Sequence, residues 1–149
     1  MNDDDRTNEI GLARFAREYY DSAVAADEVV GSRPGYEHVA PAPVMHLVAQ
    51  AIELALKAFL RWKGVSLKGI VRLGHDLEAC LSEANKHGLA EYVELSEEEL
   101  DLFSLISQLH SSTELRYICT GAKQLPIFGP LQTLAKRILD AICPAVGYR

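Results

Sequence analysis

A stripe of polar side chains on an otherwise apolar segment is the first feature of this sequence that could do chemistry. The segment runs from residue 42 to residue 64, and its polar residues include His46, Gln50, Glu53, Lys57 and Arg61. Their spacing of i, i+4, i+7, i+11 and i+15 places them on one narrow face of an α-helix, which turns by about 100° per residue. The segment therefore predicts a buried helix with a single polar seam.

Two interpretations of this seam stay open. Glu53 and Lys57 stand in the favourable order for an i, i+4 ion pair, and a pair at the seam of a bundle needs no further function. Alternatively, His46, Gln50, Glu53 and Lys57 line a polar cleft that faces a ligand or a partner subunit.

A second set of candidates lies later in the chain. His110 and Arg116 are close in sequence; a histidine exchanges protons near neutral pH, and an arginine holds a phosphate through two hydrogen bonds. His75 could play the same acid/base part, and Tyr117 could stack on a base. Capping and packing at helix ends explain the same residues without catalysis.

The charges are unevenly distributed in a chain of net charge −6. No acidic residue interrupts the basic stretch between Glu53 and Asp76, which holds Lys57, Arg61, Lys63, Lys68 and Arg72. This stretch could contact phosphates, or it could be a solvated helix end whose cations suit the helix dipole. No group of acidic residues, histidines and cysteines has the sequence spacing typical of a metal site, so we expect neither a metal nor another cofactor.

Five helices are expected to position these residues. Apolar periodicity, capping residues and helix-breaking residues predict helices over residues 6–29, 42–64, 74–87, 96–111 and 130–143. Residues 65–74 are expected to form a loop, and residues 113–129 an ordered connection with a short extended segment at 116–120. The sequence thus predicts an all-α bundle of about five helices around a long buried second helix.

Length and composition limit the remaining possibilities. The 149 residues suffice for one domain with its own core, covering the whole chain with residues 1–5 as a disordered tail. The three widely spaced cysteines, Cys80, Cys119 and Cys143, indicate a reducing compartment rather than a disulfide framework. The acidic N-terminus does not fit a signal peptide, and no uninterrupted apolar run indicates a membrane span, so we expect a cytoplasmic protein.

One combination of motifs resembles a known family. Residues 46–60 read His-x-x-x-Gln-x-x-Glu-x-x-x-Lys-Ala-x-Leu, and after a glycine-containing loop residues 74–77 read Gly-His-Asp-Leu. This pattern resembles the HEPN superfamily (higher eukaryotes and prokaryotes nucleotide-binding domain) over roughly residues 10–142. The resemblance implies a small helical bundle, commonly a homodimer, of the kind found in toxin–antitoxin and other prokaryotic defence or RNA-processing systems.

The chain departs from the nuclease branch of that superfamily. Those ribonucleases carry an arginine followed, after four to six intervening residues, by a histidine on a late helix. No histidine follows Arg116 at this spacing, and the only pair that has it, Arg33 and His38, falls in an early loop. The motif that carries metal-independent RNA cleavage in the family is therefore absent.

We therefore expect a non-catalytic HEPN-like module that binds RNA, a nucleotide or a protein partner. The residues expected to bind it are His46, Gln50, Glu53, Lys57, Arg61, Lys68, Arg72, Arg116 and Tyr117. Two alternatives stay open. One is a divergent metal-independent endoribonuclease that uses Arg116 with His110 or His75, and the other is a pure protein-interaction module that resembles an antitoxin.

Overall fold

The computed structural model describes residues 6–112, 115 and 128–149, and these residues form an all-helical fold. The helices are α2 (Glu9–Val29), α3 (Ala42–Trp62), α4 (Leu67–Leu73), α5 (Leu77–Lys86), α6 (Glu97–Ser111) and α7 (Phe128–Val146), with one 3₁₀ turn, η1 (Leu89–Glu91). The predicted all-α bundle with a long second helix is confirmed, and that helix is α3. The tail expected at residues 1–5 and the extended segment expected at residues 116–120 lie outside the described residues.

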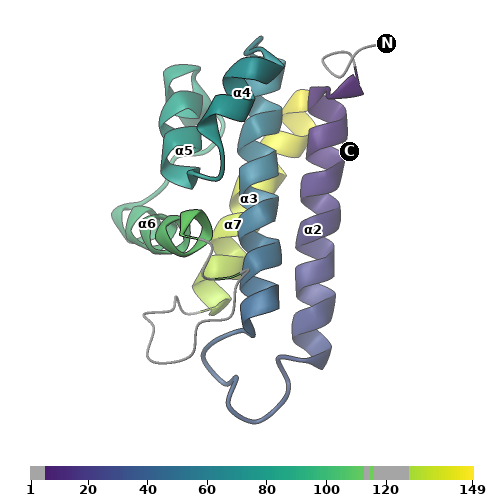
Figure 1. Cartoon of the computed structure of the whole chain (residues 1–149), viewed down its shortest axis with the longest axis vertical. Coiled ribbons are helices and arrows are strands. Elements are labelled where there is room, and N and C mark those ends of the chain that lie inside the picture. Colours follow the sequence, from purple (N-terminus) through teal and green to yellow (C-terminus); the bar gives the residue numbers. More distant parts are fainter. Residues whose placement is uncertain (1–5, 113–114, 116–127) are drawn as a thin grey trace.

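Helix α3 lies at the centre of the bundle. It packs against α2 along most of its length, against α7 behind it, and against α4, α5 and α6 on the side away from α2 (Figure 1). Of the helices described, α3 alone is long and apolar enough to cross a membrane, but 72% of its most apolar stretch is buried inside the bundle. Its apolar character is accounted for by its place in the core.

Both ends of α3 follow from local sequence. Pro41 precedes the helix and Pro43 lies in its first turn, where a missing N–H costs nothing. The helix stops at Gly64, which adopts the left-handed conformation with φ of 92°. The amide of Val65 then donates to the carbonyl of Leu60, which satisfies a backbone group at the helix end.

Helix α4 lies within residues 65–74, for which the sequence predicts a loop, and that prediction is wrong. Ser66 caps the helix, because its hydroxyl accepts a hydrogen bond from the amide of Gly69 at 3.1 Å. Ile70 then buries its side chain against the core, and Gly74, with φ of 57°, ends the helix. With seven residues and an internal glycine, α4 is too short to show a clear helical period in the sequence.

Helix α7 begins before Pro130 and continues through Pro144, where the sequence analysis expected it to end. Pro144 lies in the last turn, so its ring disturbs only the end of the hydrogen-bonded ladder. The stop is Gly147, with φ of 100°, and the amide of Tyr148 closes the helix by donating to the carbonyl of Cys143 at 2.8 Å. A left-handed glycine, rather than the proline, therefore ends α7.

Caps fix the starts of the two helices that follow α4. The carboxylate of Asp76 accepts from the amide of Ala79 at 3.0 Å and starts α5 directly after His75. Ser96 and Glu99 form the predicted capping box at the start of α6, with both hydrogen bonds at 3.1 Å. The first cap fixes the start of α5 directly after His75. The second fixes the start of α6, whose last turn carries His110.

A charged substitution in the buried face of α3 tests its placement. Ile52 has no exposed surface, so Ile52→Asp would bury an unpaired charge and should unfold the domain. Circular dichroism during thermal melting measures this loss. The matched control is Val71→Asp, since Val71 is 67% exposed and should tolerate the same charge. If Ile52→Asp melts like the parent protein, the assigned core position of α3 is wrong.

Candidate functional site

The centre of the candidate site is Glu53, a carboxylate from the middle of α3 that is only 2% exposed. Its Oε1 lies 2.9 Å from Nδ1 of His75 and 2.9 Å from Nε2 of His110. Its Oε2 accepts a hydrogen bond from Nζ of Lys57 at 3.1 Å. We call these four residues, Glu53, Lys57, His75 and His110, the Glu53 cluster.

The cluster joins three segments that are far apart in the sequence. Glu53 and Lys57 come from α3, His75 from the turn between α4 and α5, and His110 from the last turn of α6. Lys57 also donates to the carbonyl of Gly74 at 2.8 Å, which fixes the backbone next to His75. The polar seam of α3 therefore faces other helices of the same chain at this point.

The hydrogen bonds keep Glu53 ionised. Burial alone would raise the pKa of the Glu53 carboxyl, but hydrogen bonds from His110 and His75 and the charge of Lys57 outweigh burial and lower the pKa to about 2. An ionised carboxylate only accepts hydrogen bonds, so both histidine nitrogens that face Oε1 must carry hydrogen. The carboxylate thereby sets the tautomer of each neutral imidazole, with hydrogen on Nδ1 of His75 and on Nε2 of His110.

The two histidines differ in access to solvent. The side chain of His75 is 48% exposed, whereas the side chain of His110 is fully buried. Nδ1 of His110 has no hydrogen-bond partner within the described part of the chain. Of the two histidines named as acid/base candidates, only His75 can meet a ligand that approaches from solvent.

The remaining seam residues have different roles. The ring of His46 lies beside that of His110, with 5.9 Å between centroids, and Gln50 is half-buried on the same face. Arg61 donates to the carbonyls of Thr7 at 2.9 Å and Val65 at 3.2 Å, so it holds backbone segments together. The predicted stripe thus contributes two residues to the cluster, while His46 and Gln50 continue the same face and Arg61 holds backbone segments together.

The other predicted binding residues lie away from the cluster or outside the described residues. Lys68 and Arg72 are exposed on α4, one turn apart. Arg116 and Tyr117 lie outside the described residues, so the structure does not place them relative to either histidine.

Aromatic side chains accompany the cations at the α4 end of α3. Nζ of Lys63 lies 4.5 Å from the ring centroid of Trp62 and 5.6 Å from that of Tyr92, which is 40% exposed. The Trp62 and Tyr92 rings meet edge to face at 5.7 Å. We call Trp62, Lys63, Lys68, Arg72 and Tyr92 the basic–aromatic surface. Sequence spacing does not indicate Tyr92, because it follows η1, thirty residues after Trp62.

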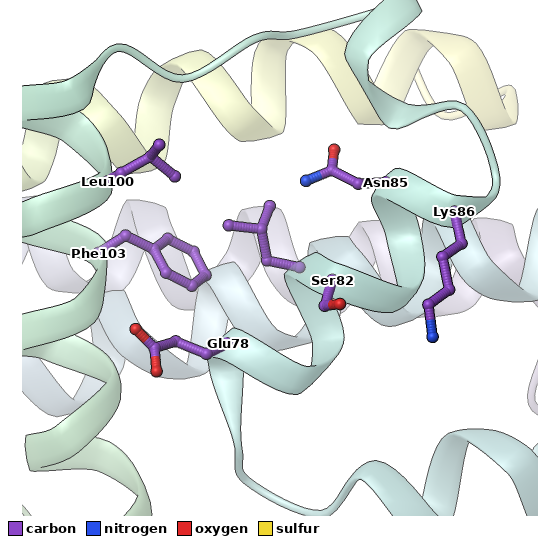
Figure 2. A pocket seen from close by; sticks show the side chains of 7 residues that line it. Glu78, Ser82, Asn85, Lys86, Leu100 and Phe103 are labelled. Carbon is purple, nitrogen blue, oxygen red and sulfur yellow. The ribbon is translucent and has the colours of Figure 1, made fainter.

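A groove of about 590 Å³ lies between α5 and α6 (Figure 2). Leu100 and Phe103 reach it from α6, and Ser82 and Asn85 line it from α5. Of the described residues that line it, only Glu78 and Lys86 are charged, and neither histidine of the Glu53 cluster borders it. The groove is therefore distinct from the chemistry that is gathered around Glu53.

Cys80 is not a candidate nucleophile. Its side chain is buried, and burial raises the pKa of its thiol to about 12, against the opposing charge of Lys57.

Acid/base exchange and cation binding are the chemistry that the Glu53 cluster offers, because one carboxylate oxygen and two imidazole nitrogens lie within 4.8 Å of one another. No one helix carries all three residues, so helical spacing could not reveal them.

Comparison of the chain with protein-family models, with curated proteins and with solved structures finds no match. The site is therefore interpreted from its own geometry.

The depressed pKa of Glu53 predicts a loss of stability in acid. The unfolded carboxyl, with an ordinary pKa of 4.5, takes up a proton before the folded one, so the stabilisation is present above about pH 5 and disappears as the pH falls toward 2. We expect this group to contribute about 3 kcal/mol to the free energy of unfolding over that interval. Urea unfolding at successive pH values measures it.

Glu53→Gln is the comparison for this measurement. The variant keeps the shape of the side chain but cannot titrate, so its stability should depend less steeply on pH below 5. The carboxylates of Glu99 and Asp140, which also have lowered pKa values through their basic partners, remain in both proteins. Equal pH dependence in the two proteins would contradict a stabilising ionised Glu53.

Proposed function

We propose that the chain is a HEPN-like helical module that binds RNA on the basic–aromatic surface. The observation that carries the proposal is the contact of Lys63 with Trp62 and Tyr92 at the end of α3, together with the exposed Lys68 and Arg72 on α4, the helix that follows α3. Base stacking on aromatic rings combined with cations that contact phosphates is the usual means by which proteins bind single-stranded nucleic acids.

The local charge supports RNA over a partner that carries no phosphates. Within the described part of the chain neither Lys68 nor Arg72 forms an ion pair. The Lys68 ammonium and the Arg72 guanidinium are therefore both available to a ligand from solvent. The chain as a whole carries a net charge of −6, so an RNA would meet an attractive field at this end of the molecule and repulsion elsewhere. Lys63 directly follows α3, and Lys68 and Arg72 lie on α4. Cations spread in this way can contact several phosphates of one RNA chain, whereas a mononucleotide would contact fewer of them.

RNA binding should depend on these cations. We expect Lys68→Glu combined with Arg72→Glu to weaken binding of a mixed single-stranded RNA pool at least about tenfold, and binding by the parent protein to fall steeply with added salt. Gel shift at low and at moderate salt measures both. Tyr92→Ala should weaken binding by about 1 to 3 kcal/mol if a base stacks on the ring.

The control changes the net charge equally at another place. Arg14 and Arg33 are exposed on α2 and on the loop after it, so Arg14→Glu with Arg33→Glu alters the total charge as much as the α4 double variant does. Binding that falls equally in both double variants would mean that only the net charge matters. Absence of any shift at low salt would overturn the RNA-binding proposal and direct attention to a protein partner.

A second function, endoribonuclease activity, is favoured by one specific observation. His75 is half-exposed and directs Nδ1 at the buried carboxylate of Glu53, so its Nε2 is left as the basic nitrogen that can reach a substrate. A carboxylate that holds the tautomer of a histidine is a recurring arrangement in general acid/base catalysis. In this alternative Arg116 would supply the charge that stabilises the phosphate in the transition state.

Cleavage of the RNA pool in the presence of EDTA tests this alternative. We expect His75→Ala or Arg116→Ala to lower the rate about 100-fold or more, in protein that still melts cooperatively. His38→Ala changes an exposed histidine away from the cluster and should leave the rate unchanged. Activity that persists in both His75→Ala and Arg116→Ala would show that this site does not perform the cleavage.

A further inference from the structure

The Glu53 cluster places three good metal ligands together. The carboxylate of Glu53, Nδ1 of His75 and Nε2 of His110 offer one ligand atom each, and these atoms lie within 4.8 Å of one another. Two imidazoles and a carboxylate are a donor set that first-row transition metals accept, whereas magnesium and calcium prefer oxygen alone.

We propose that Glu53, His75 and His110 bind a divalent transition-metal ion such as zinc. The inference does not depend on RNA binding, which the basic–aromatic surface carries, and it assigns to the cluster a ligand that the sequence pattern did not indicate.

The distances suit such an ion. Both histidine nitrogens lie 2.9 Å from the same oxygen of Glu53. Ligands held at about 2.0 to 2.2 Å from a zinc ion are themselves about 3 to 3.5 Å apart in common coordination geometries. An ion that replaces the two shared hydrogen atoms therefore suits both oxygen–nitrogen distances, and the three ligand atoms, which lie within 4.8 Å of one another, would have to close to this ligand–ligand separation around it.

The protons also balance. In the metal-bound state the hydrogen of His75 moves from Nδ1 to Nε2, which faces solvent, and that of His110 moves from Nε2 to Nδ1. No proton leaves either neutral imidazole. Within the described residues Nδ1 of His110 has no hydrogen-bond partner, so it changes from a buried acceptor to a buried donor without losing a hydrogen bond.

Lys57 has two opposing effects on the ion. It binds Oε2 at 3.1 Å and so holds Oε1 toward the histidines, as supporting hydrogen bonds do around metal ligands. Its positive charge also repels the ion, which makes binding weaker than in a closed site of four anionic and neutral ligands. The half-exposed His75 leaves the ion an entry path and at least one coordination position for water.

Zinc titration of the metal-free full-length chain tests the proposal. We expect isothermal calorimetry to give binding of one zinc ion per chain, and thermal melting to shift upward with zinc and return with EDTA, because a ligand that binds only the folded state stabilises it. Cobalt that binds to the cluster in place of zinc should show the visible absorption typical of a protein-bound ion with low-symmetry coordination. His75→Ala, which changes a half-exposed side chain, should weaken zinc binding at least tenfold.

Two controls separate this site from other zinc ligands. His38→Ala and His87→Ala remove described histidines that are not in the cluster, and both variants should bind zinc like the parent protein. Glu53→Gln should lose zinc binding even where it remains folded. No zinc binding by the parent protein, or equal affinity in His75→Ala and the parent, would overturn the proposal.

Discussion

The constraint on which this structure depends is the burial of one carboxylate, that of Glu53, in the middle of an apolar helix. A buried charge is tolerated only when partners replace the water that it loses. Lys57 alone satisfies one carboxylate oxygen, and the other needs donors from outside α3. The turn before α5 and the end of α6 bring His75 and His110 to that oxygen. The hydrogen bonds of this one carboxylate therefore constrain where both elements lie relative to α3.

The structural interpretation of the polar seam does not exclude the chemical one. The hydrogen bonds among three segments stabilise one arrangement of helices, since any shift of α5 or α6 would leave the carboxylate with too few donors. The same hydrogen bonds fix the tautomer of a half-exposed histidine, and this is a chemical consequence that a purely apolar core could not produce.

Much of the fold could be predicted from local signals. The apolar length of α3, the proline in its first turn, the stop at Gly64 and the capping box at Ser96 each act within a few residues, so sequence spacing reveals them. Helix α4 and the true end of α7 could not be predicted in this way. Helix α4 has too few residues to show a helical period. Helix α7 continues through Pro144, which lies in its last turn, and ends at Gly147, whose backbone is left-handed.

The candidate site could be predicted only in part, for a related reason. Helical spacing placed Glu53 and Lys57 on one face, since both belong to α3. The contacts of Glu53 with His75 and with His110 span 22 and 57 residues, and they depend on how α5 and α6 pack. Tyr92 likewise reaches Trp62 only through the fold. Tertiary packing, rather than spacing, decides which polar residues meet.

The cluster and the basic–aromatic surface share a physical connection. Lys57 donates both to Glu53 and to the carbonyl of Gly74, the residue that ends α4 and precedes His75. Lys68 and Arg72 stand on that same short helix. Since seven residues carry little helical stability of their own, the orientation of α4 depends on its other contacts, namely the buried Ile70, the Ser66 cap and the hydrogen bond to the Gly74 carbonyl. The charge state of the buried carboxylate therefore helps to hold the helix that presents the exposed cations.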